Sequence, residues 1–343
     1  MPMAIPMLHQ TDLFRPHEDP DDHWDLACVY ALAVRGAIDL AGILIDHPPR
    51  GGPREYGDPD IGAVAQLNHL TGLQVPCVVG SSIPVRFRGD SQEDAPRTDR
   101  GGVAFVLRAL REAARPLAIN VVGSCRDIAL AINAAPALFA DKCAAIYLNA
   151  GNGAPDPAPG ATLEYNVALN PAAYGALFAA PCPVYWMPCF AGVAGDYTVG
   201  EFGTWYRFRQ GDVLTHLSSP LRRYFASMLT RACDAAWLRH LEEADGEALS
   251  ARLDEGRNMW CTAGFLHAAG YAVARDGSIA PRGDIGDAGV FAFEPITVTC
   301  DERGVTRWFH SNGADKRFIF HVVDTNAYPV AMTRALETLL RCL

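Results

Sequence analysis

Short apolar runs alternate with longer segments of helical periodicity along the first half of the chain. The runs are rich in Val, Ile and Leu, which is typical of strands in a parallel sheet covered on both faces. We predict strands at 4–8, 40–45, 75–79, 117–122, 144–148 and 184–187, with helices at 22–35, 61–70, 102–113, 127–133 and 171–177. Right-handed crossovers between such strands give a doubly wound α/β fold with a mostly parallel sheet.

The second half of the chain has a different pattern. Residues from about 204 to 269 are rich in helical patterns, and the longest predicted helix covers 221–241. Later elements are predicted strands at 289–299, 306–310 and 318–323 and an amphipathic helix at about 327–340. Because no Pro-, Gly- or Ser-rich linker separates these parts, we predict a single domain over 1–343 with a helical insertion at about 204–269.

Composition restricts the class of partner. The chain has 39 acidic and 29 basic residues and a formal net charge of −10. An acidic surface repels a phosphate backbone, so no nucleic acid partner is expected. No apolar run approaches the roughly 20 residues that span a bilayer, and the first residues lack a charged leader and cleavage site. We therefore expect a cytoplasmic protein with no membrane partner.

Much of the acidity lies directly after the first predicted strand. The segment 11–25 contains six carboxylates and one arginine, a local net charge of −5. Crowded carboxylates repel one another unless a cation or strong donors neutralise them. The acids at 19–22 also suit the start of a helix, but a helix cap uses only one or two of them. A divalent cation with oxygen ligands, Ca²⁺ or alternatively Mg²⁺, explains the remaining carboxylates. Zn²⁺ fits less well, because the sequence has no sulfur ligand near this segment.

The same segment carries a family resemblance. A strand, then Thr11-Asp12, then a loop and Asp19-Pro20-Asp21-Asp22 at a helix start resemble the opening signature of the inosine-uridine preferring nucleoside hydrolases. Further segments resemble the family in the same order: 74–80, 123–129, 146–151, 164–166 with 170–171, and 321–324 before the last helix. The resemblance covers about residues 4–190 and resumes near the carboxyl end.

This resemblance implies a Ca²⁺-dependent N-glycosidase that cleaves a ribonucleoside to base and ribose, as in purine or pyrimidine salvage. It also implies a homo-oligomer, either a dimer or a tetramer. Asp12 is implied as general base and metal ligand, Asp22 as the principal metal ligand, and Arg126 as a ligand through its backbone carbonyl. The implied substrate-binding residues are Asp21, Asn149, Glu164 and Asn166, with Asn152 added because it shares a loop with Asn149.

Several positions depart from the family pattern. Gln10 replaces an aspartate, and Arg126-Asp127 stand where the family has Thr-Asn. The stretch 257–263 is the best match to a later family segment, but it lacks that segment's His-Asp pair. The loop between Asp12 and Asp21 is also longer than in the family. Either Asp19 in this loop supplies the missing metal ligand, or metal binding is weakened or lost. The second case leaves a relative that binds a nucleoside or sugar without turnover as an alternative.

A third interpretation concerns zinc. Residues 19–23, with His17 nearby, also resemble the His-Pro-Asp-Asp-Glu opening of zinc-dependent sugar N-deacetylases. A zinc ion held by His17 or His23 is the observation that this alternative requires. Aromatic residues of the insertion, Trp205 and Tyr206, are candidates to stack on a nucleobase, although aromatic side chains are more often core.

Overall fold

The predicted parallel strands form the centre of the computed structural model, which describes residues 4–17, 20–48, 57–242 and 247–343. Within these residues the main sheet has nine strands in the order β12-β11-β13-β6-β5-β4-β1-β2-β3. They are β1 (Ile5–Thr11), β2 (Ile38–Ile45), β3 (Cys77–Val79), β4 (Leu117–Val121), β5 (Cys143–Asn149), β6 (Val184–Met187), β11 (Phe291–Cys300), β12 (Thr306–His310) and β13 (Arg317–Val322). All neighbouring strands from β13 to β3 in this order are parallel, whereas β11 pairs in antiparallel orientation with both β13 and β12. The predicted α/β fold with a mostly parallel sheet is confirmed.

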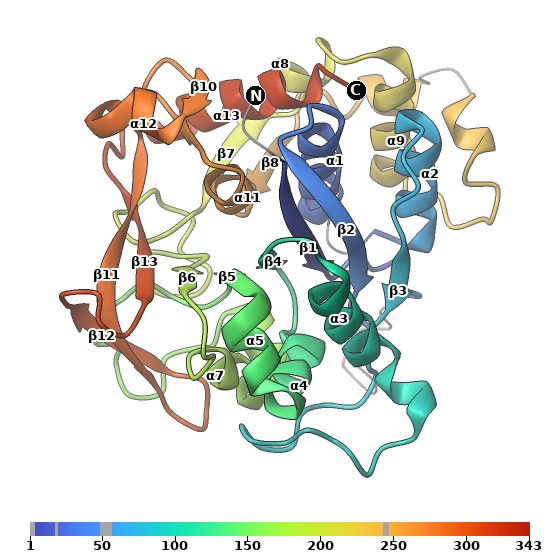
Figure 1. Cartoon of the computed structure of the whole chain (residues 1–343). Coiled ribbons are helices and arrows are strands. Elements are labelled where there is room, and N and C mark those ends of the chain that lie inside the picture. The colour runs from blue at the N-terminus through green and yellow to red at the C-terminus, as the bar shows by residue number, and fades with distance from the viewer. Residues whose placement is uncertain (1–3, 18–19, 49–56, 243–246) are drawn as a thin grey trace.

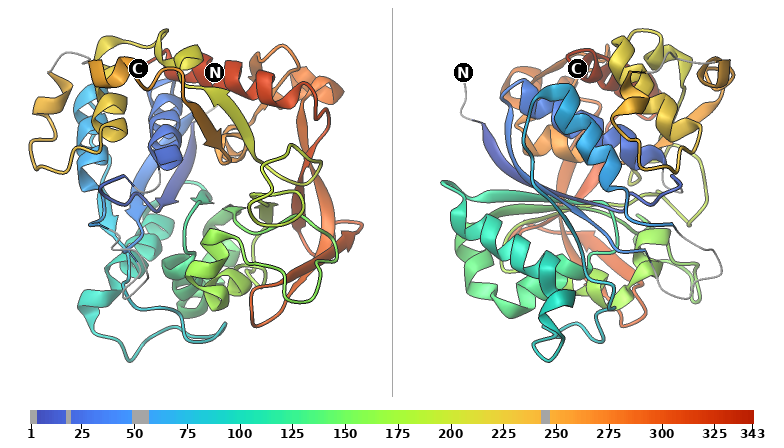
Figure 2. Two further views of the ribbon diagram at one scale, coloured as in Figure 1. Left: turned by 180° about the vertical axis from the view of Figure 1, so that it is seen from behind. Right: turned by 90° about the vertical axis from the view of Figure 1, so that its right-hand side faces the viewer.

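Helices cover both faces of this sheet (Figures 1 and 2). One layer contains α1 (Pro20–Val34), α2 (Ile61–Thr71), α9 (Ser219–Leu229), α11 (Thr262–Ala268) and α13 (Tyr328–Leu340). The other contains α3 (Gly101–Glu112), α4 (Arg126–Ala134), α5 (Pro136–Lys142) and α7 (Pro171–Leu177). Alternate residues of one strand face opposite sides, so Tyr147 of β5 enters the first apolar core, whereas Ile146 and Leu148 enter the second. None of the described helices is long and apolar enough to span a membrane.

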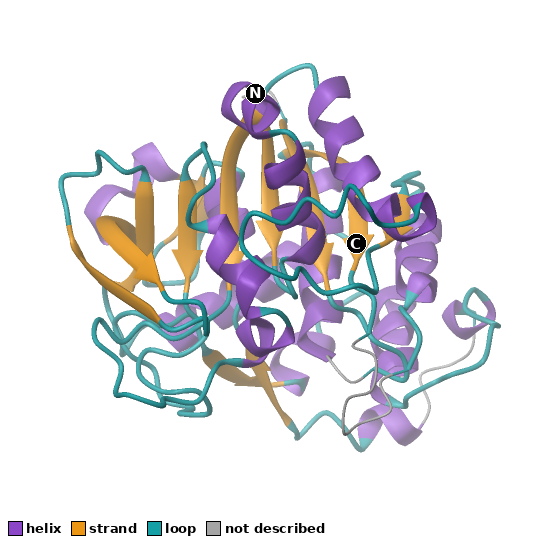
Figure 3. Cartoon of the chain, turned by 90° about the horizontal axis from the view of Figure 1, so that it is seen from below, coloured by secondary structure: helices purple, strands orange, loops and turns teal. Residues whose placement is uncertain are grey.

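Strand β1 continues beyond its predicted end at residue 8. His9, Gln10 and Thr11 are polar but almost fully buried. Their side chains are hydrogen-bonded, as in the 3.0 Å contact between His9 Nδ1 and Asn120 Nδ2. Because buried polar groups are tolerated when they are paired, the strand carries Asp12 directly to the carboxyl edge of the sheet. Figure 3 shows the strands of the sheet side by side, with arrowheads at their carboxyl ends.

The predicted helix 221–241 is wrong, because α9 ends at Leu229. Arg231 adopts a left-handed φ of 56°. The backbone N–H groups of Ala232 and Arg231 then donate to the carbonyls of Ser227 and Met228, at 3.1 and 3.0 Å. This is the Schellman arrangement that terminates helices. Just beyond this turn, the Ala232 carbonyl lies 3.3 Å from His17 Nε2.

The region 204–269 also contains strands that the periodicity did not predict. β7 (Tyr206–Arg209) pairs with β8 (Gly256–Met259) in antiparallel orientation, and β8 leads through Trp260 and Cys261 into α11. A second ribbon follows, made by β9 (Tyr271–Val273) and β10 (Ile279–Pro281). The short helices are α6 (Tyr165–Leu169), α8 (Gly211–Leu214), α10 (Glu247–Ser250), α12 (Arg282–Ile285), η1 (Arg97–Arg100), η2 (Arg239–Leu241) and η3 (Gly286–Ala288).

Candidate active site

Two of the predicted site residues meet where β1 ends and α1 begins. The Asp22 carboxylate accepts hydrogen bonds from the Thr11 hydroxyl at 2.6 Å and from the Asp12 backbone N–H at 3.1 Å, both through Oδ2. Asp12 and Asp22 are buried, with 1% and 2% of their surfaces exposed. The start of α1 therefore lies at the sheet edge, with Asp21 and Asp22 in its first turn.

Burial makes ionisation of these clustered carboxylates unfavourable. It raises the pKa of Asp22 to about 7; hydrogen bonding with Asp12 opposes the shift and the charge of Asp21 adds to it. One helical turn later, burial and the charge of Asp22 hold the pKa of Asp25 well above its usual range. A cation placed among buried carboxylates favours their ionised forms. The oxygen donors and their burial therefore fit a bound divalent cation.

Cys261 is a site residue that sequence analysis missed. One ligand atom from each of Asp22, Asp25 and Cys261 lies within 4.8 Å of the others, and all three residues are buried. The Cys261 thiol also donates to the side-chain oxygen of Asn149, at 2.9 Å between Sγ and Oδ1. The stretch 257–263 thus reaches the site, with a thiol but no His-Asp pair. Its position just after β8 was the available signal, but β8 itself was not predicted.

The predicted sugar-binding residues form a second group joined by hydrogen bonds. Glu164 caps α6 and accepts the backbone N–H groups of Gly151, Asn166 and Val167 at 2.8, 3.0 and 3.4 Å. Asn166 donates from Nδ2 to the backbone carbonyls of Val122 and Asn149, at 3.1 and 3.2 Å. Since Cys261 contacts both Asn149 and the carboxylates, it connects this group to Asp22.

The loop after β4 completes the edge, and it passes beside Asp12 at Gly123. The buried Arg126 side chain donates to Ser124 Oγ at 2.8 Å and to the His47 carbonyl at 2.5 Å. Asp46 accepts from the Ser124 N–H and from the Gln10 side chain, each at 2.5 Å. A Cβ added at Gly123 would lie 2.7 Å from Asp46 Oδ2 and 3.2 Å from the Asp12 Cβ. Only glycine therefore fits where this loop passes the carboxylates.

Comparison with known proteins identifies the architecture. No protein-family model matches the sequence. No curated protein matches it either. Among solved structures, an inosine-guanosine nucleoside hydrolase is 15% identical with a TM-score of 0.57, over 97% of this chain and 99% of that chain. A purine-preferring ribonucleoside hydrolase from Gardnerella vaginalis is 15% identical with a TM-score of 0.54, over 98% and 100%.

The chain adopts the nucleoside hydrolase fold. A further structure with this likeness is the type III effector protein XopQ complexed with adenosine diphosphate ribose, which is 14% identical with a TM-score of 0.57, over 99% of this chain and 95% of that chain. Proteins with the likeness thus include hydrolases and an effector.

In this nucleoside hydrolase-like chain, an aromatic group lies beside the polar edge. Phe190 contacts Tyr197 and Trp260 edge to face, with ring centroids 5.5 and 6.0 Å apart, and Tyr197 contacts Trp205 at 5.9 Å. Trp260 is the direct neighbour of Cys261, and Tyr197 is 51% exposed. Tyr206, by contrast, is fully buried, and its hydroxyl pairs with Thr262 at 2.9 Å. Trp205, which is 8% exposed, therefore belongs to this aromatic group through Tyr197, whereas Tyr206 lies in the core.

One predicted position lies outside the connected group, and another lies outside the described residues. Asn152 donates to the Thr162 carbonyl at 3.3 Å, and none of its hydrogen bonds in the described part of the chain reaches Asn149 or the carboxylates. Asp19 falls outside the described residues.

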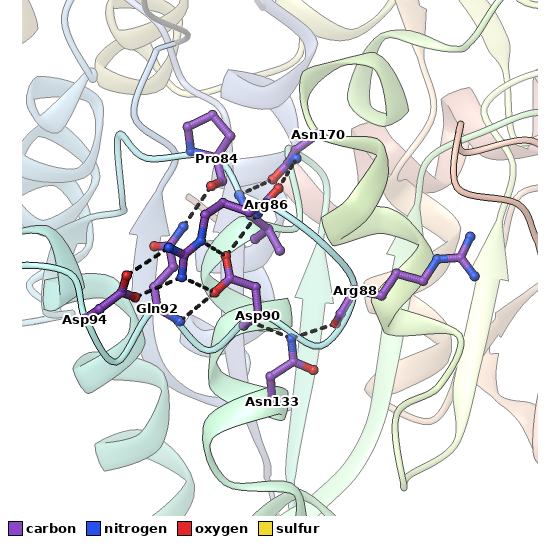
Figure 4. Close-up of polar contacts among 9 residues, drawn as sticks. Pro84, Arg86, Arg88, Asp90, Gln92, Asp94, Asn133 and Asn170 are labelled. Carbon is purple, nitrogen blue, oxygen red and sulfur yellow. Dashed lines mark hydrogen bonds and ion pairs between the residues drawn. The ribbon is translucent and has the colours of Figure 1, made fainter.

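Asn170, which belongs to the recognised sequence pattern, holds the segment between β3 and α3 by bonding both backbone groups of Val85, at 2.8 and 3.1 Å. Figure 4 shows it beside the bidentate pair of Arg86 and Asp90, where two bonds measure 2.9 and 2.7 Å. Its role in this structure is architectural.

Proposed function

We propose that this protein is a divalent-cation-dependent hydrolase that cleaves the N-glycosidic bond of a ribonucleoside to base and ribose. The observation that supports it is the buried carboxylate group of Asp12, Asp22 and Asp25, at the carboxyl edge of a sheet with the nucleoside hydrolase fold. Asp12, Asp22 and the backbone carbonyl of Arg126 would hold the cation, with Ca²⁺ as the first choice because the ligands are mainly oxygen.

Cleavage of the bond between C1 and nitrogen develops positive charge on the sugar, so a carboxylate close to the anomeric carbon stabilises the transition state. A bound cation supplies the positive charge that lowers the pKa of a water molecule. Asp12 then accepts the proton of the attacking water as general base. Its backbone is fixed by the hydrogen bond to Asp22, which limits the motion of this carboxylate.

The hydrogen-bonded cluster of Asn149, Glu164 and Asn166 would orient the sugar. Asn166 uses both N–H donors on backbone carbonyls, and no donor in the described part of the chain bonds its side-chain oxygen. That oxygen is therefore suited to accept a hydrogen bond from a ribose hydroxyl, and Asp21 is suited to accept a second. Glu164 uses its two oxygens on backbone N–H groups, so we assign it a positioning role for the loop around Gly151.

The aromatic group that contains Trp260 would contact the base. Aromatic rings stack on any nucleobase and provide little discrimination between bases. A neutral purine or pyrimidine nucleoside is therefore the expected substrate class.

Calcium calorimetry tests the cation site. We expect one Ca²⁺ per chain in the unmodified protein and binding at least about tenfold weaker in Asp22→Asn, which removes one charged ligand. Asp39→Asn is the matched control, because Asp39 is an exposed carboxylate at the other end of β2. Absence of Ca²⁺ binding, or equal binding by Asp22→Asn, contradicts the proposed site.

Cys261 favours one alternative, a protein that binds a nucleoside or ADP-ribose without turnover. A thiol is a poor ligand for Ca²⁺, and it stands in the stretch where the resemblance places a His-Asp pair. Tight binding of inosine or ADP-ribose without release of base would support this alternative. The deacetylase interpretation receives no support from the fold.

A further inference from the structure

Three buried metal-ligating side chains meet outside the carboxylate group. His17 lies in the loop after β1, His23 in the first turn of α1, and Asp60 immediately before α2. His17 Nδ1 lies 3.0 Å from Asp60 Oδ2 and 3.1 Å from His23 Nε2, and the distance from His23 Nε2 to Asp60 Oδ2 is also 3.1 Å. At most 7% of any of these residues is exposed. The three atoms therefore form a nearly equilateral triangle away from solvent.

Hydrogen bonds cannot satisfy all sides of this triangle when Asp60 is ionised. A ring nitrogen either carries a proton and donates or has a lone pair and accepts. If both inward nitrogens carry protons, the two N–H groups face each other. If only one does, the other nitrogen directs its lone pair at the carboxylate oxygen, and if neither does, all three atoms are acceptors. Each protonation state of the two imidazoles leaves at least one repulsive side.

The surrounding contacts orient lone pairs into the triangle. His17 Nε2 lies 3.3 Å from the Ala232 carbonyl, which only accepts, so this nitrogen carries the proton and the Nδ1 of a neutral imidazole is left as an inward acceptor. Asp60 uses its other oxygen, Oδ1, to cap α2 by accepting the Ala63 N–H at 3.2 Å. Histidine ligands of metals commonly donate their second N–H to a carbonyl in this way.

We propose that His17, His23 and Asp60 bind one divalent transition-metal ion of the Zn²⁺ class. Two imidazoles and one carboxylate are a ligand set that such ions use. Two ligands about 2.1 Å from one ion and about 95° apart lie about 3.1 Å from each other, which is the separation of all three pairs here. A cation at this distance from all three atoms would replace each repulsive side with attraction to the shared ion.

This site is separate from the proposed Ca²⁺ site. Asp22 and His23 are consecutive in a helix, so their side chains point about 100° apart. Asp22 faces the end of β1, whereas His23 faces the start of α2. The carboxylate is the N-cap of α2 and does not belong to the Asp21–Asp22 pair that the deacetylase resemblance uses. The ion would join His17 to α1 and to the start of α2, and so fix the position of His17 relative to both helices.

Zinc calorimetry on the full-length chain after chelator treatment tests the inference. We expect one Zn²⁺ site that is weakened at least about tenfold by Asp60→Asn. Asparagine retains an oxygen to cap α2, so this variant removes the ligand with little change to the helix. His17→Gln is the second variant and must weaken Zn²⁺ to a similar extent. His69→Gln, an exposed histidine on α2, is the matched control and should bind as the unmodified protein does.

Cobalt spectroscopy and Cys261→Ser locate the ion. Asp22, Asp25 and Cys261 form another cluster with a thiol, so the proposal requires that Cys261→Ser retain the site and that bound Co²⁺ show no thiolate charge-transfer band. Zinc binding that is absent, that survives both Asp60→Asn and His17→Gln, or that disappears in Cys261→Ser overturns the proposal. Asp22→Asn should retain Zn²⁺ and lose Ca²⁺, whereas Asp60→Asn should do the reverse, so the two sites can fail separately.

Discussion

Removal of the Glu164 carboxylate tests whether this residue positions the site or only contacts substrate. In Glu164→Ala, three backbone N–H groups lose their acceptor, and those of Gly151 and Asn166 form the shorter bonds, at 2.8 and 3.0 Å. A hydrogen bond to a charged group contributes about 1.5–3 kcal/mol when it is buried. The two shorter bonds alone therefore predict a loss of about 3 kcal/mol in the free energy of unfolding.

The expected shift in melting temperature follows from the chain length. Unfolding entropy is about 2.1 cal/mol/K per residue near 60 °C, or about 0.7 kcal/mol/K for 343 residues. A loss of about 3 kcal/mol then corresponds to a decrease of about 4 °C in Tm. Differential scanning calorimetry of the substrate-free protein measures this directly.

Glu302→Ala is the matched control for this experiment. Glu302 is exposed in the turn between β11 and β12, so its substitution should change Tm by less than about 1 °C. Glu164→Gln should have an intermediate Tm, because glutamine retains one acceptor oxygen. If Glu164→Ala melts within 1 °C of the unmodified protein, the positioning role is refuted.

Two further predictions concern stability. Burial, together with the charge of Arg282, lowers the pKa of His267 to about 3 from 6.5. Because the unfolded state binds the proton first, stability falls as pH decreases below about 6.5. Urea titrations should show that His267→Asn removes about 1.4 kcal/mol of the loss between pH 7.5 and 5.5. Equal pH dependence in the two proteins would contradict this assignment. Asn170→Ala should lower the free energy of unfolding by about 2–3 kcal/mol, because both backbone groups of buried Val85 lose their partner. The exposed Asn326→Ala is its control, and equal denaturation midpoints for the two variants would show that the Val85 contacts contribute nothing.

Hydrophobic periodicity predicted the parallel sheet because each strand is a short apolar run between helices. Periodicity did not predict where α9 ends or that β7 and β8 form, because backbone geometry and strand pairing determine these features. The left-handed Arg231 ends α9 with no Gly or Pro to mark the stop. β7 and β8 have mixed polar sequences, Tyr206–Arg209 and Gly256–Met259, and they exist through pairing with each other across the insertion. Such pairing is not encoded in either segment alone.

The acidic segment predicted part of the site because adjacent carboxylates are visible in the sequence. Asp12 and Asp22 do meet, and Glu164 and Asn166 do adjoin Asn149. Contacts between distant segments were not predictable. Cys261 reaches Asn149 only through the unpredicted β8, and Asp60 reaches His17 and His23 only through the packing of α2 on α1.

Product analysis of a nucleoside incubated with the protein and Ca²⁺ tests the central claim most directly. Inosine and uridine at concentrations close to that of the protein would be separated by chromatography, and free base and ribose would be quantified. The proposal predicts equal amounts of base and ribose with the unmodified protein and loss of both with Asp12→Asn, while Asp39→Asn remains active. Nucleosides that bind but stay intact, or cleavage that survives Asp12→Asn, would contradict it.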